Sequence, residues 1–165
     1  MKYFISLVFL LSGFYSNGQS SIPTDHYCFL SFDKGEYSGL DKKSVPATLN
    51  DSDFVTLELV LSDCICKYNR EQTAGFKERI RKFPNDSLKL DEFTIDLNEY
   101  YRQYMVVRNR KGEKEVWINC LCEVQYVKDW TKRVIQVMDG GKCYFSIKIN
   151  LKKKSYSHFM VNGIA

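Results

Sequence analysis

The spacing of apolar residues changes once along the chain, and this change restricts the folds that it can adopt. Within residues 51–68, apolar side chains recur at steps of three and four, which is the spacing of a helix with one buried face. From Phe93 onward apolar and polar residues alternate instead, as in strands that bury one face of a sheet. Neither element can bury its apolar side alone. The order predicts an α+β fold in which one main N-terminal helix packs against a curled antiparallel sheet of four or more strands.

The expected helix has a clear start and a less regular continuation. Its apolar stripe consists of Phe54, Leu57, Leu61, Cys64, Ile65 and Tyr68. Asn50 or Ser52 can cap the first turn, because a side-chain oxygen there accepts a hydrogen bond from a free backbone N–H. Residues 69–92 are more polar, and the sequence predicts only a turn or two of helix there, ending before Pro84.

Five runs in the second half of the chain have the composition of strands. They are Tyr100–Arg108, Glu115–Val124, Val134–Met138, Cys143–Leu151 and Tyr156–Val161. A short polar link with Gly112 predicts a hairpin between the first two runs, and Asp139-Gly140-Gly141 predicts another between the third and fourth. The lead-in 19–49 is irregular, with a short strand or strap from His26 to Phe32. Residues 127–133 fit either a short helix or a strap.

Alternation assigns two faces to the sheet. We assign to the core, against the helix, Val116, Ile118, Cys120, Cys122, Cys143, Phe145, Ile147, Ile149, Phe159 and Val161. The opposite face then carries the candidate binding residues Arg102, Tyr104, Trp117, Asn119, Tyr144, Lys148 and His158. Aromatic residues and Arg are enriched where proteins bind. The alternative is that loops or residues 19–49 cover this face, so that Trp117 and Tyr144 belong to a second core.

The first residues predict export. Lys2 precedes an almost wholly apolar run from Phe4 to Phe14, which has the length of a signal-peptide core and is too short to span a bilayer. Small residues at Ser16 and Gly18 place the expected cleavage before Gln19. The alternative is a buried N-terminal helix. The expected organisation is a signal peptide 1–18, a lead-in 19–49 and a single α+β domain 50–165, in a periplasmic or secreted protein without stable membrane insertion.

Cysteine usage agrees with an exported chain. The six cysteines are Cys28, Cys64, Cys66, Cys120, Cys122 and Cys143, and an even number in an exported protein suggests disulfides. A bridge from Cys143 to Cys120 or Cys122 fits neighbouring strands. The alternative is that several are buried free thiols. Both C-x-C pairs are closer in sequence than the usual zinc-ligand spacing, so no metal site is expected.

No complete catalytic set is found in the sequence. It contains no nucleophile elbow, C-x-x-C motif, phosphate loop or dinucleotide fingerprint, so no catalytic residue and no cofactor is assigned. The net charge of +4 is too small to indicate nucleic acid as a partner. A pocket between helix and sheet would need a titratable group such as His26, Asp63 or Asp96.

Four stretches of residues 100–165 carry a resemblance. They are Tyr101-Arg102-Gln103-Tyr104, Val116-Trp117-Ile118-Asn119-Cys120-Leu121-Cys122, Asp139-Gly140-Gly141-Lys142-Cys143-Tyr144-Phe145 and Val161-Asn162-Gly163. They resemble uncharacterised small exported proteins of Bacteroidota-type bacteria, and the Gly18–Gln19 junction is similar to cleavage sites in that group. The resemblance implies a periplasmic or secreted location and no particular activity. The expected architecture is similar to the cystatin-like and nuclear-transport-factor-like folds.

These observations favour a non-enzymatic domain that binds a protein or peptide partner through the open sheet face or its edge. A cystatin-like hydrolase inhibitor is one version of this hypothesis. The alternatives are a small-ligand-binding or enzymatic domain with a pocket between helix and sheet, and a structural part of the cell envelope. The sequence leaves the oligomeric state open.

Overall fold

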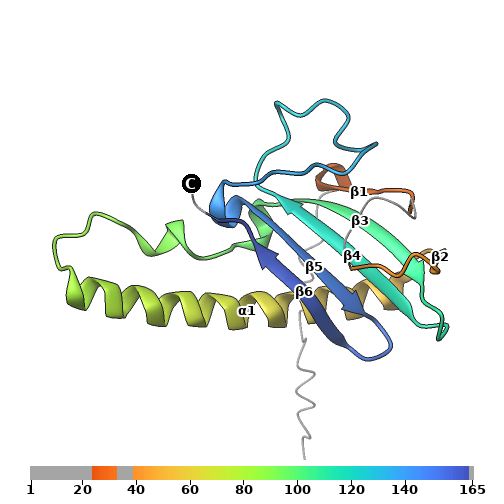
Figure 1. Cartoon of the computed structure of the whole chain (residues 1–165), viewed down its shortest axis with the longest axis horizontal. Helices are drawn as coiled ribbons and strands as arrows, with labels where there is room; N and C mark the ends of the chain where they lie inside the picture. The colour runs from red at the N-terminus through yellow and green to blue at the C-terminus, as the bar shows by residue number, and fades with distance from the viewer. Residues whose placement is uncertain (1–23, 33–38, 164–165) are drawn as a thin grey trace, which may run out of the picture.

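The computed structural model describes residues 24–32 and 39–163 (Figure 1). The predicted signal peptide and its cleavage site lie outside the described residues. The described residues contain no helix that is both long enough and apolar enough to cross a membrane.

One long helix, α1 (Asp51–Lys82), begins where the sequence predicts and continues further. The Asn50 side chain accepts a hydrogen bond from the backbone N–H of Asp53 at 2.9 Å, and the Asp53 carboxylate accepts one from the N–H of Asn50 at 3.0 Å. This reciprocal pair is a capping box, which satisfies two N–H groups that the helix itself leaves free. The expectation of only a turn or two after residue 69 is wrong, because α1 is unbroken up to its cap at Phe83, directly before Pro84.

The sheet contains six strands in a mixed arrangement. They are β1 (Tyr27–Phe29), β2 (Val45–Pro46), β3 (Tyr101–Arg108), β4 (Lys114–Leu121), β5 (Tyr144–Asn150) and β6 (Ser155–Val161). Their order is β1-β3-β4-β5-β6, with β2 also paired to β3. The strands β3 to β6 form an antiparallel meander, whereas β1 runs parallel to β3. Two short strands therefore precede the helix. β1 lies within the run His26–Phe32, where the sequence predicts a short strand or strap, whereas β2 was not predicted.

The predicted hairpin around Asp139-Gly140-Gly141 is wrong, whereas the hairpin β3–β4 and the final strand are confirmed. Residues 134–138 form no strand, and β5 pairs with β4 instead, with Val116 opposite Ile149. The physical reason is that the main chain of Ile135 is hydrogen-bonded by side chains that stand on the sheet, so this run crosses over the sheet and does not join it. The two glycines do adopt positive φ, 87° at Gly140 and 56° at Gly141.

The main core lies between α1 and one face of the sheet. Leu57 and Leu61 of α1 are fully buried together with Ile118, Ile147 and Ile149 of the strands. Burying a side chain of this size contributes about 1.5–3 kcal/mol. Most of the residues assigned to this face by alternation are members of the core or pack against it, so the assignment is confirmed for β4, β5 and β6.

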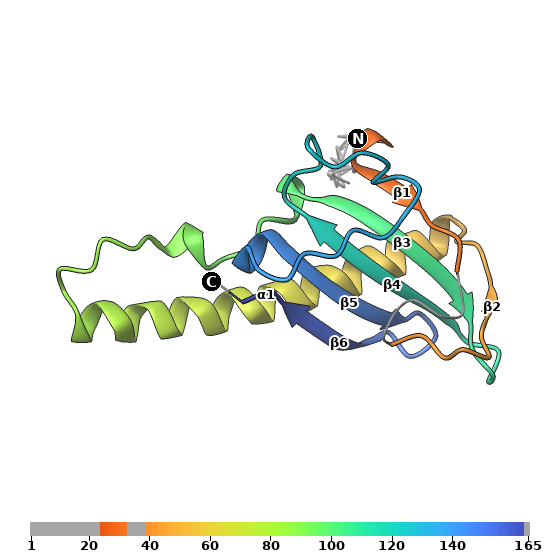
Figure 2. The same cartoon turned by 45° about the horizontal axis from the view of Figure 1, so that its top comes forward.

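A second apolar cluster covers the opposite face of the sheet. Met105, Val107 and Trp117 stand on that face and are buried together with Leu40, while Leu30, Phe32 and Val134 pack against them. Figure 2 shows the 122–143 segment running over this face, so the sheet is enclosed from both sides. Of the two sequence-based alternatives, the covered face is the one found for Trp117, whereas Tyr144 is half-buried and is not a member of this cluster.

Candidate recognition loop

The residues that the sequence placed on one binding face are divided between both sides of the sheet. Arg102 and Tyr104 lie beneath α1, because they pair across the sheet with Cys120 and Ile118 of the main core. Nη1 of Arg102 donates to both carboxylate oxygens of Glu58 at 2.9 Å, and Nη2 donates to the carbonyl of Leu97 at 3.0 Å. These two residues are therefore structural, and burial raises the pKa of the Tyr104 hydroxyl.

The other predicted binding residues lie on the outer face or at its edge. Trp117 and Asn119 are buried, with 7% and 8% of their surfaces exposed. Tyr144 is half-buried, and Lys148 lies 3.9 Å from a carboxylate oxygen of Glu115. His158 is exposed on the edge strand β6, at an irregularity in its pairing, with φ of 52°. Among the described residues, Leu30, Phe32 and Leu40 together with the 122–143 segment cover this face, so Trp117 is not open to a partner.

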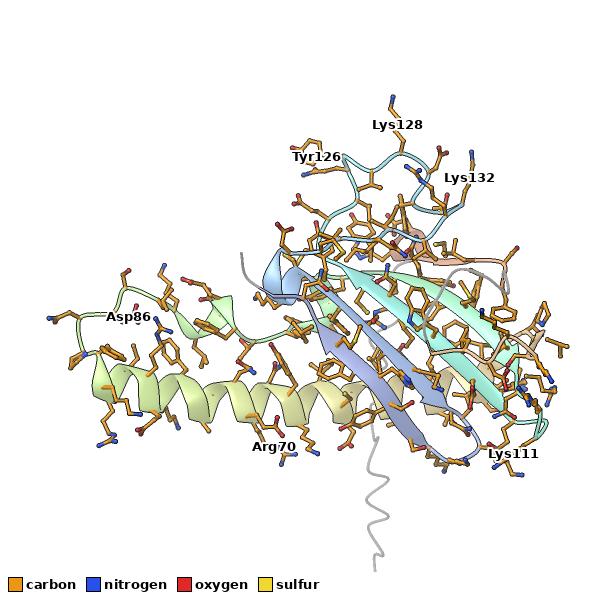
Figure 3. All side chains as sticks on the ribbon, in the orientation of Figure 1. Arg70, Asp86, Lys111, Tyr126, Lys128 and Lys132 are labelled. Carbon is orange, nitrogen blue, oxygen red and sulfur yellow. A yellow bond between two sulfur atoms is a disulfide. The ribbon has the colours of Figure 1, made fainter. Side chains whose placement is uncertain are left out.

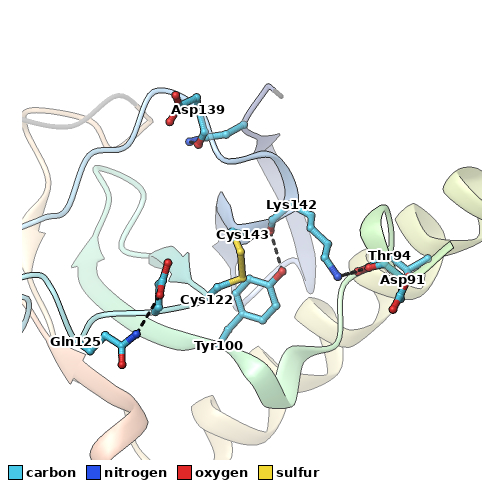
Figure 4. The surroundings of a disulfide bond; sticks show 10 residues. Asp91, Thr94, Tyr100, Cys122, Gln125, Asp139, Lys142 and Cys143 are labelled. Carbon is cyan, nitrogen blue, oxygen red and sulfur yellow. Dashed lines mark hydrogen bonds between the residues drawn. A yellow bond between two sulfur atoms is a disulfide. The ribbon is translucent and has the colours of Figure 1, made fainter. Parts of the chain in front are cut away.

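That covering segment, residues 122–143, is here called the cross-sheet loop. A disulfide between Cys122 and Cys143 closes its base, with the two Cα atoms 4.8 Å apart (Figure 4). The hydroxyl of the buried Tyr100 donates to the carbonyl of Lys142 at 2.7 Å. The Lys142 ammonium donates to the carbonyls of Asp91 and, at 2.8 Å, Thr94. The base of the loop is thus tied both to itself and to the segment that follows α1.

Two buried amide side chains hold the middle of the loop. Gln103 donates to the carbonyls of Trp130 and, at 2.7 Å, Arg133, and its oxygen accepts from the N–H of Ile135 at 3.1 Å. Asn119 donates to Gln103 at 2.9 Å and to the carbonyl of Ile135 at 2.8 Å. Buried polar groups cost free energy unless they are paired. Because the loop backbone supplies most of their partners, these two side chains fix its path across the sheet.

The return end of the loop is fixed by the C-terminal residues. Nδ2 of Asn162 donates to the carbonyls of Val137 at 2.6 Å and Asp139 at 2.9 Å. A Cβ added to Gly140 would lie 2.7 Å from the Tyr144 ring. The backbone at Gly140 also has a positive φ, which side chains disfavour, so only glycine fits this position. Tyr144 therefore acts as a support beneath the loop.

Three loop residues project away from this framework, and they are here called the loop crown: Tyr126, Lys128 and Lys132 (Figure 3). Tyr126 is 84% exposed, and both lysines are exposed. Lys132 pairs with Asp129 at 3.1 Å, whereas Lys128 has no ion-pair partner within the described ranges. An exposed aromatic side chain with neighbouring cations, on a loop with a fixed base, is a typical arrangement of a binding surface.

The remaining cysteines are free thiols. They are Cys28, Cys64, Cys66 and Cys120, so of the six candidate disulfide cysteines only Cys122 and Cys143 are bridged. Burial raises the pKa of the Cys28 and Cys64 thiols to about 11 and that of Cys120 to about 12. A thiol with such a pKa holds its proton at neutral pH and is a poor nucleophile or metal ligand.

The titratable groups considered for a pocket do not come together. Asp63 and Asp96 are exposed on different elements, while the His26 ring lies 4.4 Å from the ring of Tyr101. The space between α1 and the sheet is filled by apolar side chains. Within the residues that the structure describes, no three His, Cys, Asp or Glu side chains are placed to hold a metal ion.

The crown residues and the role of Gln103 were not predicted from the sequence. Gln103 and Asn119 are polar residues at the centre of strands that are otherwise apolar, which indicates partners outside the sheet. The run between Cys122 and Cys143 is also too long for a tight hairpin turn, which favours a crossing loop. These two signals together could have identified the loop.

Comparison of the chain with protein-family models, curated proteins and solved structures gives no significant match. The resemblance to exported Bacteroidota-type proteins therefore stays a prediction.

Proposed function

We propose that this chain is an exported, non-enzymatic domain that binds a protein or peptide partner through the crown of its cross-sheet loop. The observation that carries the proposal is the 84% exposure of Tyr126 on a loop that is otherwise held by a disulfide and by buried amides. An exposed Tyr brings a large contact area at low entropic cost, and a fixed loop base lowers the ordering cost of binding.

Export is supported by the predicted signal peptide and by the disulfide, since such bonds persist mainly in oxidising compartments. A location in the periplasm or outside the cell follows from it. We also propose a cystatin-like architecture, supported by the long helix packed on a four-stranded antiparallel meander. In that case the projecting loop suits an inhibitor that occludes a hydrolase.

The rival proposal of a small-ligand or enzymatic pocket has less support. It needs an open cavity between α1 and the sheet with a titratable group inside. That interface contains fully buried apolar residues such as Leu57, Leu61 and Ile147. The polar pair within it, Arg102 and Glu58, is joined by an ion pair at 2.9 Å, and Arg102 also donates to the carbonyl of Leu97, so neither charge faces an open cavity.

The test is affinity capture from the source organism's envelope and culture fluid, followed by titration of any captured protein. The crown variant carries Tyr126→Ala and Lys128→Ala. The matched control carries Leu59→Ala and Lys67→Ala, which remove an exposed apolar side chain and a lysine from the outer side of α1. We expect the crown variant to bind roughly thirtyfold more weakly, because a central interface residue contributes about 2 kcal/mol.

Two results would reject this function. One is a captured protein that binds the crown variant as tightly as the unchanged chain. The other is an equal loss in both variants, which would indicate a general effect of surface change. Trp117→Ala is unsuitable as a test, because Trp117 is buried in the second cluster and its removal would loosen the loop itself.

A further inference from the structure

The net positive charge of the molecule is concentrated at one end of its sheet. Three turns meet there: residues 41–44, the β3–β4 turn and the β5–β6 turn. We call this end the basic pole, and its cationic residues are Lys42, Lys43, Arg108, Arg110, Lys111, Lys114, Lys152, Lys153 and Lys154. The turns themselves contain two acidic residues, Asp41 and Glu113, and Glu115 of β4 lies beside Lys114, where it accepts a hydrogen bond from Asn109 at 2.9 Å. The whole chain carries a net charge of +4, so this end is far more basic than the rest.

The three turns are held together by specific contacts. Arg110 and Asp41 form an ion pair at 2.7 Å between the first turn and the β3–β4 turn. Glu113 accepts a hydrogen bond from Asn150 at 2.9 Å and lies 3.6 Å from the Lys153 ammonium, which joins the β3–β4 and β5–β6 turns. The pole is therefore one surface and not three independent loops.

Most of the charge at the pole is not neutralised. Lys114 pairs with Asp53 of α1. In the turns, Asp41 pairs with Arg110 and Glu113 pairs with Lys153. For the part of the chain that the structure describes, no carboxylate pairs with the exposed side chains of Lys42, Lys43, Lys111, Lys152 and Lys154. The like charges on neighbouring turns repel one another, so an anionic partner would lower the electrostatic repulsion that is present in the free molecule.

From this arrangement we propose that the basic pole docks the protein onto an anionic lipid surface. The charges lie on the tips of turns, so they can meet a flat surface together. Most of them are lysines, which act as flexible point charges and suit a surface of phosphate headgroups more than one shaped ligand. Val45, 53% exposed and paired with Arg108, adds an apolar side chain next to the charges. The three turns contain no aromatic residue on which a nucleic-acid base could stack.

This surface is separate from the loop crown. The β3–β4 and β5–β6 turns lie at one end of β4 and β5, whereas the disulfide-closed base of the cross-sheet loop lies at the other. Figure 3 shows Lys111 far from Tyr126 and Lys128. A membrane-docked molecule would thus keep its crown free for a partner.

The experiment is co-sedimentation of residues 19–165, the chain expected after signal-peptide cleavage, with vesicles. Mixed phosphatidylcholine and phosphatidylglycerol vesicles are compared with vesicles of phosphatidylcholine alone. The pole variant carries Lys111→Gln, Lys152→Gln and Lys154→Gln. The control variant carries Lys67→Gln, Lys77→Gln and Lys89→Gln, which are exposed lysines on α1 and the segment after it, so both lose the same charge.

We expect salt-sensitive binding to the anionic vesicles only. The pole variant should bind about a hundredfold more weakly, since each lysine near such a surface is worth about 1 kcal/mol and about 1.4 kcal/mol is tenfold. The control variant should bind like the unchanged chain. Equal weakening in both variants, equal binding to neutral vesicles, or no binding to either vesicle would overturn the proposal. So would a soluble polyphosphate that binds the chain as tightly as the vesicles do.

Discussion

At Arg102 a guanidinium group lies beneath α1 with only 3% of its side chain exposed. Burying a charge costs several kcal/mol unless a partner of opposite charge and further hydrogen bonds compensate for it. Glu58 supplies the charge, and the carbonyl of Leu97 accepts a second hydrogen bond. The pair joins the helix to β3 at a point where both neighbours are apolar core.

We expect Glu58→Gln to destabilise the fold by about 1–2 kcal/mol. The estimate is below that for a fully buried pair, because Glu58 is 36% exposed and solvent screens it. The measurement is urea unfolding followed by circular dichroism. Asp63→Asn, an exposed change on the same helix, is the control and should stay within about 0.5 kcal/mol. Equal effects of the two changes would contradict a special role for the pair.

The position of Arg102 also shows where residue-level prediction fails. In β3 the run Tyr101 to Val107 has large or apolar side chains at nearly every position, so alternation does not reveal which residues face the helix. A shift of one residue exchanges the two faces of a strand. Alternation therefore places Arg102 and Tyr104 on the outer face, which is wrong, whereas the assignment of β5, where alternation is regular, is confirmed.

Among the elements, the cross-sheet loop depends most on its covalent closure. The bridged cysteines are separated by 21 positions, and closing a loop of about this length removes unfolded-chain entropy worth about 3 kcal/mol. We expect the double change Cys122→Ser and Cys143→Ser to lower stability by about that amount in thermal unfolding. Cys66→Ser, which removes an exposed free thiol, is the control. If reductant lowers the melting temperature of the double variant as much as that of the unchanged chain, the bridge is not the cause.

Two glycines in different elements should respond in opposite directions to alanine. At Gly75, within α1, an added Cβ meets nothing within 4 Å, so Gly75→Ala should stabilise the helix by about 0.5–1 kcal/mol. At Gly140 the positive φ and the Tyr144 ring both oppose a side chain, so Gly140→Ala should destabilise the protein. Chemical denaturation of both variants checks this, and a stabilising effect at Gly140 would show that the loop end is not held as described.

Local signals predicted the elements that depend on local interactions. The start of α1 followed from the capping sequence after Asn50, and β4, β5 and β6 followed from alternation. The run 134–138 has a strand-like composition but serves as a cover, because its backbone partners are the side chains of Gln103 and Asn119. Those contacts join residues 16 to 32 positions apart, a distance over which sequence patterns carry little information.

For the molecule as a whole, α1 covers one face of the sheet, and the cross-sheet loop together with Leu30, Phe32 and Leu40 covers the other. The second half of α1 extends beyond the strands (Figure 1). This extension packs against the returning chain. Asn69 exchanges two hydrogen bonds of 2.8 Å with the backbone of Ile95, and the rings of Phe76 and Phe93 lie 5.9 Å apart. Because this part of α1 has only a narrow contact with the returning chain, residues 69–92 are mostly polar. They lack a clear repeat of apolar residues, so the sequence did not reveal the length of the helix.

Several carboxylates across the molecule have a pKa below the ordinary value, which makes the stability dependent on acid. A hydrogen bond from Asn150 lowers the pKa of Glu113, one from Arg79 lowers that of Asp86, and the N–H of Lys43 together with Arg110 lowers that of Asp41. A group whose pKa is lower in the folded state than in the unfolded state stabilises the fold at pH values above its unfolded-state pKa. That stabilisation is lost as the pH falls through the folded pKa.

Stability should therefore be constant near neutral pH and should decline once the pH falls below the ordinary values of 4.5 for Glu and 3.8 for Asp. Urea midpoints measured across this range test the expectation. Glu113→Gln should make the decline less steep, because it removes one group that must take up a proton on unfolding. Glu99→Gln is the control, since Glu99 is exposed and has no hydrogen-bonded side-chain partner within the described segments. A decline of the same steepness in both variants would mean that the contacts joining the turns of the basic pole do not contribute to acid sensitivity.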